Sequence, residues 1–169
     1  MKISTNSKEL RQLNACSSGY NQFIKVHRNN EVTLSQCLDS NSWSDVYWFI
    51  SEAYDQFSAE QKHDLRIFGC KKALINIEKI KPYCSEYNYQ LIIDYLNNPT
   101  EEARSAVKSV TWSVAKSAVD SSAKLAALSA AWSAAKLAAW SAVESAEKSA
   151  SMEENIRDLR ELFVKWESK

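Results

Sequence analysis

A four-residue period over residues 101–150 constrains the fold of this chain more than any other feature of its sequence. Serine opens most units, two mostly small residues follow it, and the last position is large or charged, as at Lys108, Trp112 and Lys116. The segment contains no glycine or proline, and alanine is the strongest helix former. We therefore predict that the repeat is helical. Its serines are Ser105, Ser109, Ser113, Ser117, Ser121, Ser129, Ser133, Ser141, Ser145 and Ser149, with Leu125 and Leu137 in the two gaps.

The step of four residues also predicts how the repeat packs. Successive residues of an α-helix turn by about 100°, so each unit overshoots a full turn by roughly 40°. Small side chains let helix backbones approach closely, but over the whole run this face winds around the axis. We predict that the run breaks into packed helices at Val119–Ser122, where serine and aspartate can cap a helix. The alternative is one long helix wrapped by the rest of the chain. Trp132 and Trp140 lie on nearly the same face and would anchor the packing.

Composition predicts an all-α fold. The 169 residues are 45% hydrophobic, which is enough for one domain with a substantial core. Only 2 glycines and 2 prolines occur, which are few for the tight turns of a β-rich fold. We predict a compact multi-helix bundle in a single domain, residues 1–169. Its expected parts are short amphipathic helices over 1–98, Ala/Ser-rich repeat helices over 99–150 and a C-terminal amphipathic helix over 151–169.

Capping signals place the individual helices. A serine or threonine followed three residues later by glutamate or glutamine marks a helix start, and glycine or proline marks an end. We expect Ser7 to cap a first helix over 7–16 that Gly19 ends, and Pro82 to end a helix over 58–80. Further expected starts are a helix from residue 20, capping boxes at Thr33–Gln36, Ser58–Gln61 and Ser151–Glu154, and caps at Ser42 or Ser44, Ser85 and Thr100.

The charge balance narrows the classes of partner. The formal net charge is +0, whereas a nucleic-acid binder is basic and a DNA mimic strongly acidic, so we expect no nucleic-acid partner. The N-terminal segment MKISTNSKELRQLNA has no apolar core of a signal peptide, and no stretch is long and apolar enough to span a bilayer. We therefore expect a cytoplasmic protein without a membrane partner.

The sequence carries no motif typical of catalysis or of metal binding. No cysteine pair has the CxxC spacing of a zinc site, and without an export signal we expect reduced, buried thiols. Glu60 and His63 have the Glu-x-x-His spacing of di-iron bundles, but that chemistry needs the motif twice. No serine lies in a turn of the G-x-S-x-G type, and no glycine-rich phosphate loop occurs. We predict no metal, no cofactor and no enzymatic activity. The cysteines are Cys16, Cys37, Cys70 and Cys84.

Two stretches are candidates for binding a protein partner. The segment WSDVYWFISEAY combines acids with more aromatic residues than a small core needs, and such residues often anchor interfaces. Lysines at 71, 72, 79 and 81 form the densest basic cluster, which is more typical of a solvated face than of a docking patch for an acidic partner. With the tryptophans of the repeat, the candidates are Trp43, Asp45, Tyr47, Trp48, Glu52, Lys71, Lys72, Trp132 and Trp140.

Several stretches resemble the immunity-protein family, all-helical proteins of bacteria and tailed bacteriophages. They are LNACSSGYNQFIKVH, SWSDVYWFI, DLRIFGCKKALINIEKI, LIIDYLNNPTEEARSAV with the alanine-rich repeat that follows it, and IRDLRELF. The repeat here is rich in serine and spaced by lysine, where the family is richer in alanine and arginine. The resemblance implies a helical fold and the neutralisation of a toxin or effector by binding, and it carries over no catalytic residue.

These observations give one leading hypothesis and two alternatives. We expect a non-enzymatic binding protein, encoded by a phage, that neutralises a host defence protein, effector or toxin by direct contact. One alternative is a structural homo-oligomer, in which the alanine faces of the repeat pack between subunits. The other is a protein that sequesters a small signalling nucleotide between its helices.

Overall fold

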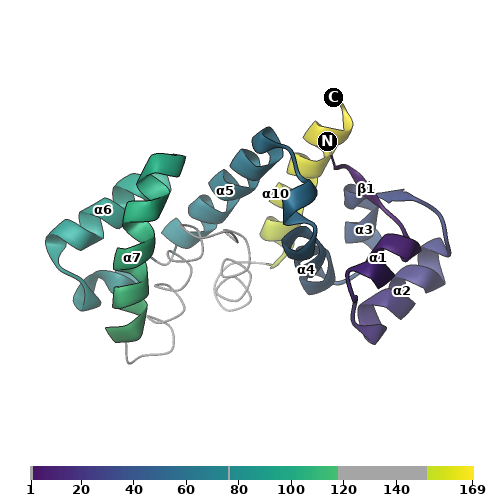
Figure 1. Cartoon of the computed structure of the whole chain (residues 1–169), viewed down its shortest axis with the longest axis horizontal. Coiled ribbons are helices and arrows are strands. Elements are labelled where there is room, and N and C mark those ends of the chain that lie inside the picture. The colour runs from purple at the N-terminus through teal and green to yellow at the C-terminus, as the bar shows by residue number, and fades with distance from the viewer. Residues whose placement is uncertain (1, 76, 118–151) are drawn as a thin grey trace. The chain divides into compact units, whose positions relative to one another are not determined.

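The computed structural model describes residues 2–75, 77–117 and 152–169 (Figure 1). These residues are overwhelmingly helical, and the sheet found among them has 2 short strands, which confirms the all-α prediction. The tryptophans Trp132 and Trp140, the expected break at Val119–Ser122 and the expected cap at Ser151 lie outside the described residues. Clustering of contacts divides the chain into two compact units, Met1–Lys62 with Met152–Lys169 and His63–Ser151.

The first unit contains both ends of the chain (Figure 1). The strands β1 (Ser4–Thr5) and β2 (Val32–Thr33) pair antiparallel, with Ser4 opposite Thr33. Thr33 and Gln36 form the expected capping box at the start of the third helix, and Ser42 rather than Ser44 caps the fourth through a second box with Asp45. The helical elements of this unit are α1 (Ser7–Gln12), α2 (Ser17–His27), α3 (Leu34–Ser40), α4 (Trp43–Glu52), η1 (Tyr54–Gln56), the start of α5 (Ala59–Leu74) and α10 (Met152–Glu167).

Aromatic side chains make up much of the core of the first unit. Trp166 of α10 packs at ring-centroid distances of 5.8 Å from Phe57 and 5.5 Å from Phe163. Burial of such large rings is the main source of stability in a small unit, because each removes much apolar surface from water. The buried aromatic residues of this unit are Phe23, Trp43, Tyr47, Phe49, Phe57, Phe163 and Trp166.

The C-terminal helix α10 is fixed to α3 by hydrogen bonds. Glu167 accepts from the Ser35 amide at 3.1 Å and from the Ser35 hydroxyl at 2.8 Å. Arg160 donates to the Asp39 carboxylate at 2.8 Å. The Glu167 carboxylate therefore caps the N-terminus of α3, where free amides and the helix dipole favour a negative charge.

The buried side chain of Gln61 fixes the N-terminal segment to the start of α5. Its carbonyl oxygen accepts from the amides of Lys2 at 3.1 Å and Ser58 at 3.0 Å, and its amide nitrogen donates to the Lys2 carbonyl at 2.6 Å. The Gln61 backbone amide donates in turn to the Ser58 hydroxyl at 3.2 Å, which confirms the capping box expected at Ser58–Gln61. One glutamine thus satisfies three backbone groups that burial would otherwise leave unpaired.

The second unit has an aliphatic core. It contains the rest of α5, η2 (Ile77–Tyr83), α6 (Glu86–Asn97) and α7 (Glu101–Ser117), and α6 packs along α7 (Figure 1). Ser85 and Thr100 cap α6 and α7 as expected, accepting from the amides of Asn88 and Ala103. The first units of the repeat are thus helical. The buried cluster comprises Cys70, Ala73, Ile77, Ile80, Tyr89, Ile92, Tyr95, Leu96 and Val107.

Several expected helix boundaries are wrong, among them the start expected at residue 20, since α2 begins at Ser17. Asn6 caps α1 by accepting from the Glu9 amide at 3.0 Å, and Ser7 lies inside the helix; asparagine caps helices as well as serine does. Gly19 lies within α2 and does not end a helix. Pro82 lies inside η2, after α5 has ended at Leu74. A 3₁₀ turn places Ile77 and Ile80 on one side, where both are buried, so burial and not proline sets this element.

Candidate functional site

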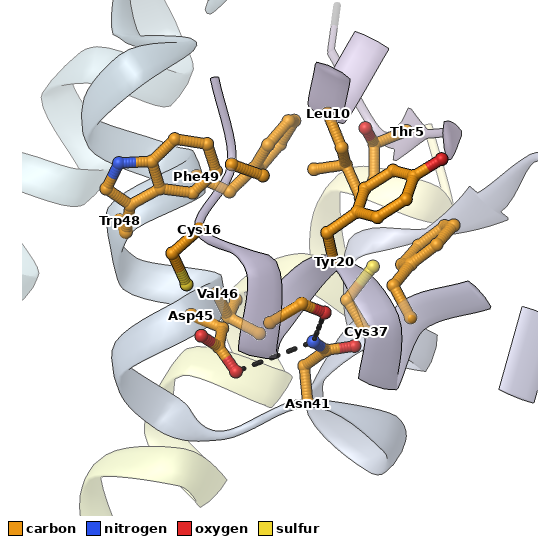
Figure 2. Close-up of a pocket in the computed structure, with 13 residues that line it drawn as sticks. Thr5, Leu10, Cys16, Tyr20, Cys37, Asn41, Asp45, Val46, Trp48 and Phe49 are labelled. Carbon is orange, nitrogen blue, oxygen red and sulfur yellow. Dashed lines mark hydrogen bonds between the residues drawn. The ribbon is translucent and has the colours of Figure 1, made fainter. Parts of the chain in front are cut away.

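The first unit has an apolar pocket formed by α1, α2, α3 and α4 (Figure 2). Its volume is about 30 Å³. A single water needs about 10–15 Å³, so the pocket has room for about two or three heavy atoms. The pocket is open at one side, where Cys16, Tyr20, Asp45 and Trp48 form a rim that is at least partly exposed. A group of that size, such as the tip of an aliphatic side chain, can enter it.

The floor of the pocket is hydrophobic. It is made by Leu10 of α1, Phe23 of α2, Cys37 of α3, and Val46 and Phe49 of α4, each less than 9% exposed. Burial raises the pKa of the Cys37 thiol to about 12, so this sulfur is neutral at physiological pH. A floor without charge favours an apolar group, at about 25 cal/mol per Å² of apolar surface removed from water.

Two half-buried aromatic residues stand at the rim. Trp48 of α4 and Tyr20 of α2 line different sides of the opening in the view of Figure 2. The guanidinium of Arg11 lies 5.1 Å from the centroid of the Tyr20 ring, within cation–π range. Partly exposed tryptophan and tyrosine beside a pocket are typical of surfaces that bind other proteins.

A hydrogen-bond network joins α4 to α2 at the polar part of the rim. Asp45 accepts from the amide of Ser42 at 3.2 Å and from its hydroxyl at 2.8 Å. Asn41 donates to the Gly19 carbonyl at 2.9 Å and, more weakly, to Asp45 at 3.5 Å (Figure 2). The hydrogen-bond donors of this part of the rim are therefore engaged within the protein, and the group that it offers to a partner is the Asp45 carboxylate.

Gly19 allows the close approach of α2 to the Asp45 side chain. A Cβ atom on Gly19 would lie 2.5 Å from Asp45 Oδ1 and 2.9 Å from Asp45 Cγ. A Cβ atom would fit only if the Asp45 carboxylate moved away, so the glycine serves close packing here and not a turn. Gly19 was expected to end a helix, because a close approach between distant elements leaves no local signal in the sequence.

Cys16 carries a thiol at the rim of the pocket. It is exposed, in contrast to the expectation that all four cysteines are buried; all four are free, and Cys37 and Cys70 are buried as expected. The pKa of the Cys16 thiol is lowered, first by a hydrogen bond from the Ser18 hydroxyl and then by one from the Gly19 backbone amide, against burial and the Asp45 charge. Cys16 precedes α2 as its N-cap, where a thiolate is favoured.

The structure separates the residues that the sequence offered as partner-binding candidates. Asp45 and Trp48 lie at the pocket rim, and Glu52, one turn beyond Trp48 on α4, is exposed. Trp43 and Tyr47 of the same helix belong to the core, at 5% and 1% exposure. In the second unit, Lys71 is exposed, whereas Lys72 is 6% exposed and its ammonium lies 5.7 Å from the Phe68 ring centroid. Trp132 and Trp140 lie outside the described residues.

Sequence reasoning missed the residues that complete the pocket from outside α4. Ala15, Cys16, Tyr20 and Asn41 come from connections or other helices, and no motif joins them. For the residues of α4, the sequence does contain a signal that separates the buried face from the exposed one. Val46, Ile50 and Ala53 define the buried face by helical periodicity, which leaves Asp45, Trp48 and Glu52 on the opposite one.

A second depression of the first unit is wider and polar. It has a volume of about 360 Å³ and is lined by residues of α1, including Lys8, and by Gln56. The Glu9 carboxylate at its edge is already engaged by Lys2 and by the Thr5 hydroxyl. Such a surface offers a partner few apolar contacts, so the smaller, hydrophobic pocket is the better candidate site.

In residues 2–75, 77–117 and 152–169, no three histidine, cysteine, aspartate or glutamate side chains are grouped as metal ligands. None of the helices in these ranges has the length and apolar character needed to cross a membrane. Comparison with protein-family models, with curated proteins and with solved structures finds no match.

Proposed function

We propose that the chain is a non-enzymatic helical binding protein that neutralises another protein by direct contact. The partner is a toxin, an effector or a host defence protein, in line with the resemblance to immunity proteins. The observation that carries this proposal is the apolar pocket of the first unit with the half-buried Trp48 at its rim. Proteins bind one another through such places, where one side chain of the partner enters a pocket beside an aromatic residue.

The size of the pocket favours a protein over a nucleotide as the ligand of this site. Room for about two or three heavy atoms admits the tip of a side chain but not a purine or pyrimidine ring. The tip must be presented from outside by a larger body, and Trp48 and Tyr20 give that body aromatic surface to cover. The homo-oligomer alternative depends on the alanine faces of the repeat, most of which lie outside the described residues.

The test is affinity capture from a lysate of the source cell, followed by binding measurements with the purified partner. We expect the full chain to retain one protein in stoichiometric amount. Trp48→Ala should weaken its affinity by about tenfold or more, since tryptophans at interface pockets often contribute more than 1.4 kcal/mol.

The matched control is Tyr87→Ala on α6 of the second unit. Tyr87 is 76% exposed, so its removal deletes an aromatic side chain without touching the pocket. The Tyr87→Ala variant should bind the partner with the same affinity as the unchanged chain. The proposal is contradicted if no protein is recovered in stoichiometric amount. It is also contradicted if Trp48→Ala and Tyr87→Ala weaken the affinity for the partner equally.

A further inference from the structure

We infer that the pocket recognises an aliphatic side chain of the partner that is accompanied by a lysine or arginine nearby. This inference rests on the proposed function, and it specifies the chemistry of the contact. The occupant is one short stretch of a partner protein, in which a valine, leucine or isoleucine enters the pocket and a cation lies against α4. Two independent features of the site support this inference. They are the small volume of the hydrophobic pocket and the negative charge of its rim.

The floor selects an aliphatic tip. Leu10, Phe23 and Val46 present carbon atoms to the pocket, and the Cys37 thiol is kept neutral by burial. The volume of about 30 Å³ matches the branched end of valine, leucine or isoleucine, whereas the ring of phenylalanine or tryptophan is too large without rearrangement. A polar tip would lose its hydrogen bonds to water and find few partners among the buried lining residues, where the Thr5 hydroxyl already donates to Glu9.

The rim along α4 selects a cation. Asp45, Trp48 and Glu52 are spaced three and four residues apart, so they follow one face of α4. Among the described residues, no lysine or arginine forms an ion pair with Asp45 or Glu52. The two carboxylates therefore give this face a negative potential that a partner's cation would complement.

The other side of the rim orients the partner. The Arg11 guanidinium lies over Tyr20 on the side of α1 and α2, and it would repel a second cation there. The cation of the partner is therefore directed toward α4. Trp48, between Asp45 and Glu52 on that face, provides a ring against which its aliphatic stem can pack.

The experiment is selection from a library of random linear peptides displayed on phage, with the full chain as bait. The matched counter-bait is Ala15→Leu. Ala15 is a half-buried residue of the pocket in the connection between α1 and α2, and three added carbons would occupy the cavity. We expect enriched peptides to share an aliphatic residue with lysine or arginine within about one helical turn, and to lose enrichment on the filled pocket. A control bait, Ala59→Leu, adds the same carbons at an exposed position of α5 and should select the same peptides as the unchanged chain.

A synthetic peptide of the selected sequence then tests the two features separately. Replacing its aliphatic residue with alanine should weaken binding by about tenfold or more, because about 0.8 kcal/mol is lost per buried methylene. Glu52→Gln and Asp45→Asn in the protein should each weaken binding by about two- to fivefold, with the loss reduced at high salt. Bound peptide should also slow alkylation of the exposed Cys16 thiol at the rim.

The inference is overturned if the selected peptides share an aromatic or acidic residue instead. It is also overturned if Ala15→Leu enriches the same peptides as the unchanged chain, or if no peptide is enriched. Each of these results leaves the proposed function standing if a captured protein still depends on Trp48. Absence of any captured protein removes the proposed function itself, so the two failures are distinguishable.

Discussion

The two units of this protein are both helical, but they are stabilised in different ways. In the first unit, aromatic rings and aliphatic side chains share the core, and hydrogen bonds made by Gln61 and accepted by Glu167 fix segments that are far apart in the sequence. In the second, isoleucine, leucine, valine and alanine pack with two tyrosines around α6 and α7. The pocket lies in the aromatic unit, beside Phe23 and Phe49.

The comparison of the two units indicates which of them is better suited to bind a partner protein. Short helices joined by tight connections bring four elements to one rim, which exposes Trp48, Tyr20 and Cys16 around a hydrophobic floor. The second unit also exposes apolar side chains, Ile75 at 52% and Tyr87 at 76%, but neither lines the pocket. We therefore expect the first unit to carry recognition of the partner.

The largest expected effect is on the aromatic core. Trp166→Ala should lower the free energy of unfolding by about 3–5 kcal/mol, because Trp166 is 1% exposed and packs on Phe57 and Phe163. Ile92→Ala in the second unit should lower it by about 2–4 kcal/mol. Urea unfolding measures both. Hydrogen exchange should show Trp166→Ala loosening mainly Met1–Lys62 and Ile92→Ala loosening mainly His63–Ser117; identical exchange patterns would remove the distinction between the units.

The second prediction concerns the long-range cap of α3. Glu167→Ala should lower stability by about 1–3 kcal/mol, since the Ser35 amide and hydroxyl lose their acceptor. Glu161→Ala is the matched control, because this exposed glutamate lies on the same helix. Its effect should stay within about 0.5 kcal/mol. Equal effects of the two substitutions in thermal unfolding would show that the contact with Ser35 does not stabilise α3.

The third prediction concerns the contact that shapes the rim. Gly19→Ala should destabilise by about 1–3 kcal/mol, because the new Cβ meets Asp45 Oδ1 at 2.5 Å. In an Asp45→Ala background the same change should be neutral or stabilising by up to about 1 kcal/mol, since alanine is the better helix former. A double-mutant cycle by urea unfolding measures this reversal. Additive effects would mean that Gly19 and Asp45 do not constrain each other.

The smallest effect is on thiol reactivity. Cys16 should be alkylated faster than Cys84 near neutral pH, because the pKa of Cys16 is lowered while burial raises that of Cys84. A lowered pKa leaves more thiolate at a given pH, and the thiolate is the nucleophile. Ser18→Ala should slow labelling of Cys16, since the Ser18 hydroxyl is the first cause of the shift. Iodoacetamide labelling followed by mass spectrometry gives both rates. Faster labelling of Cys84 would contradict the prediction.

Local signals were sufficient for most helix starts. The boxes Thr33–Gln36 and Ser58–Gln61 and the cap Ser85 lie within one helical turn, so the sequence displays both partners of each bond. The strand pairing of Ser4 with Thr33 was not predicted, because pairing over that distance depends on the helices around it. The same holds for Glu167 and Ser35, which are 132 residues apart.

The candidate site was predicted only where a single helix carries it. Asp45 and Trp48 were named because acids and aromatic residues are concentrated in α4, but Trp43 and Tyr47 were named with them. Composition does not distinguish a buried ring from one at a rim, whereas the packing of α4 does. Ala15 and Cys16 were not named as partner-binding residues, since only the folded chain places them beside α4.

The central claim is that the pocket of the first unit anchors the partner. The most direct test is the dissociation constant of the captured partner for the unchanged chain, for Ala15→Leu and for Ala59→Leu, all shown to fold by circular dichroism and thermal unfolding. The account predicts about tenfold or greater weakening for Ala15→Leu and no change for Ala59→Leu, since only Ala15 lines the pocket. Unchanged affinity for the filled pocket would contradict it.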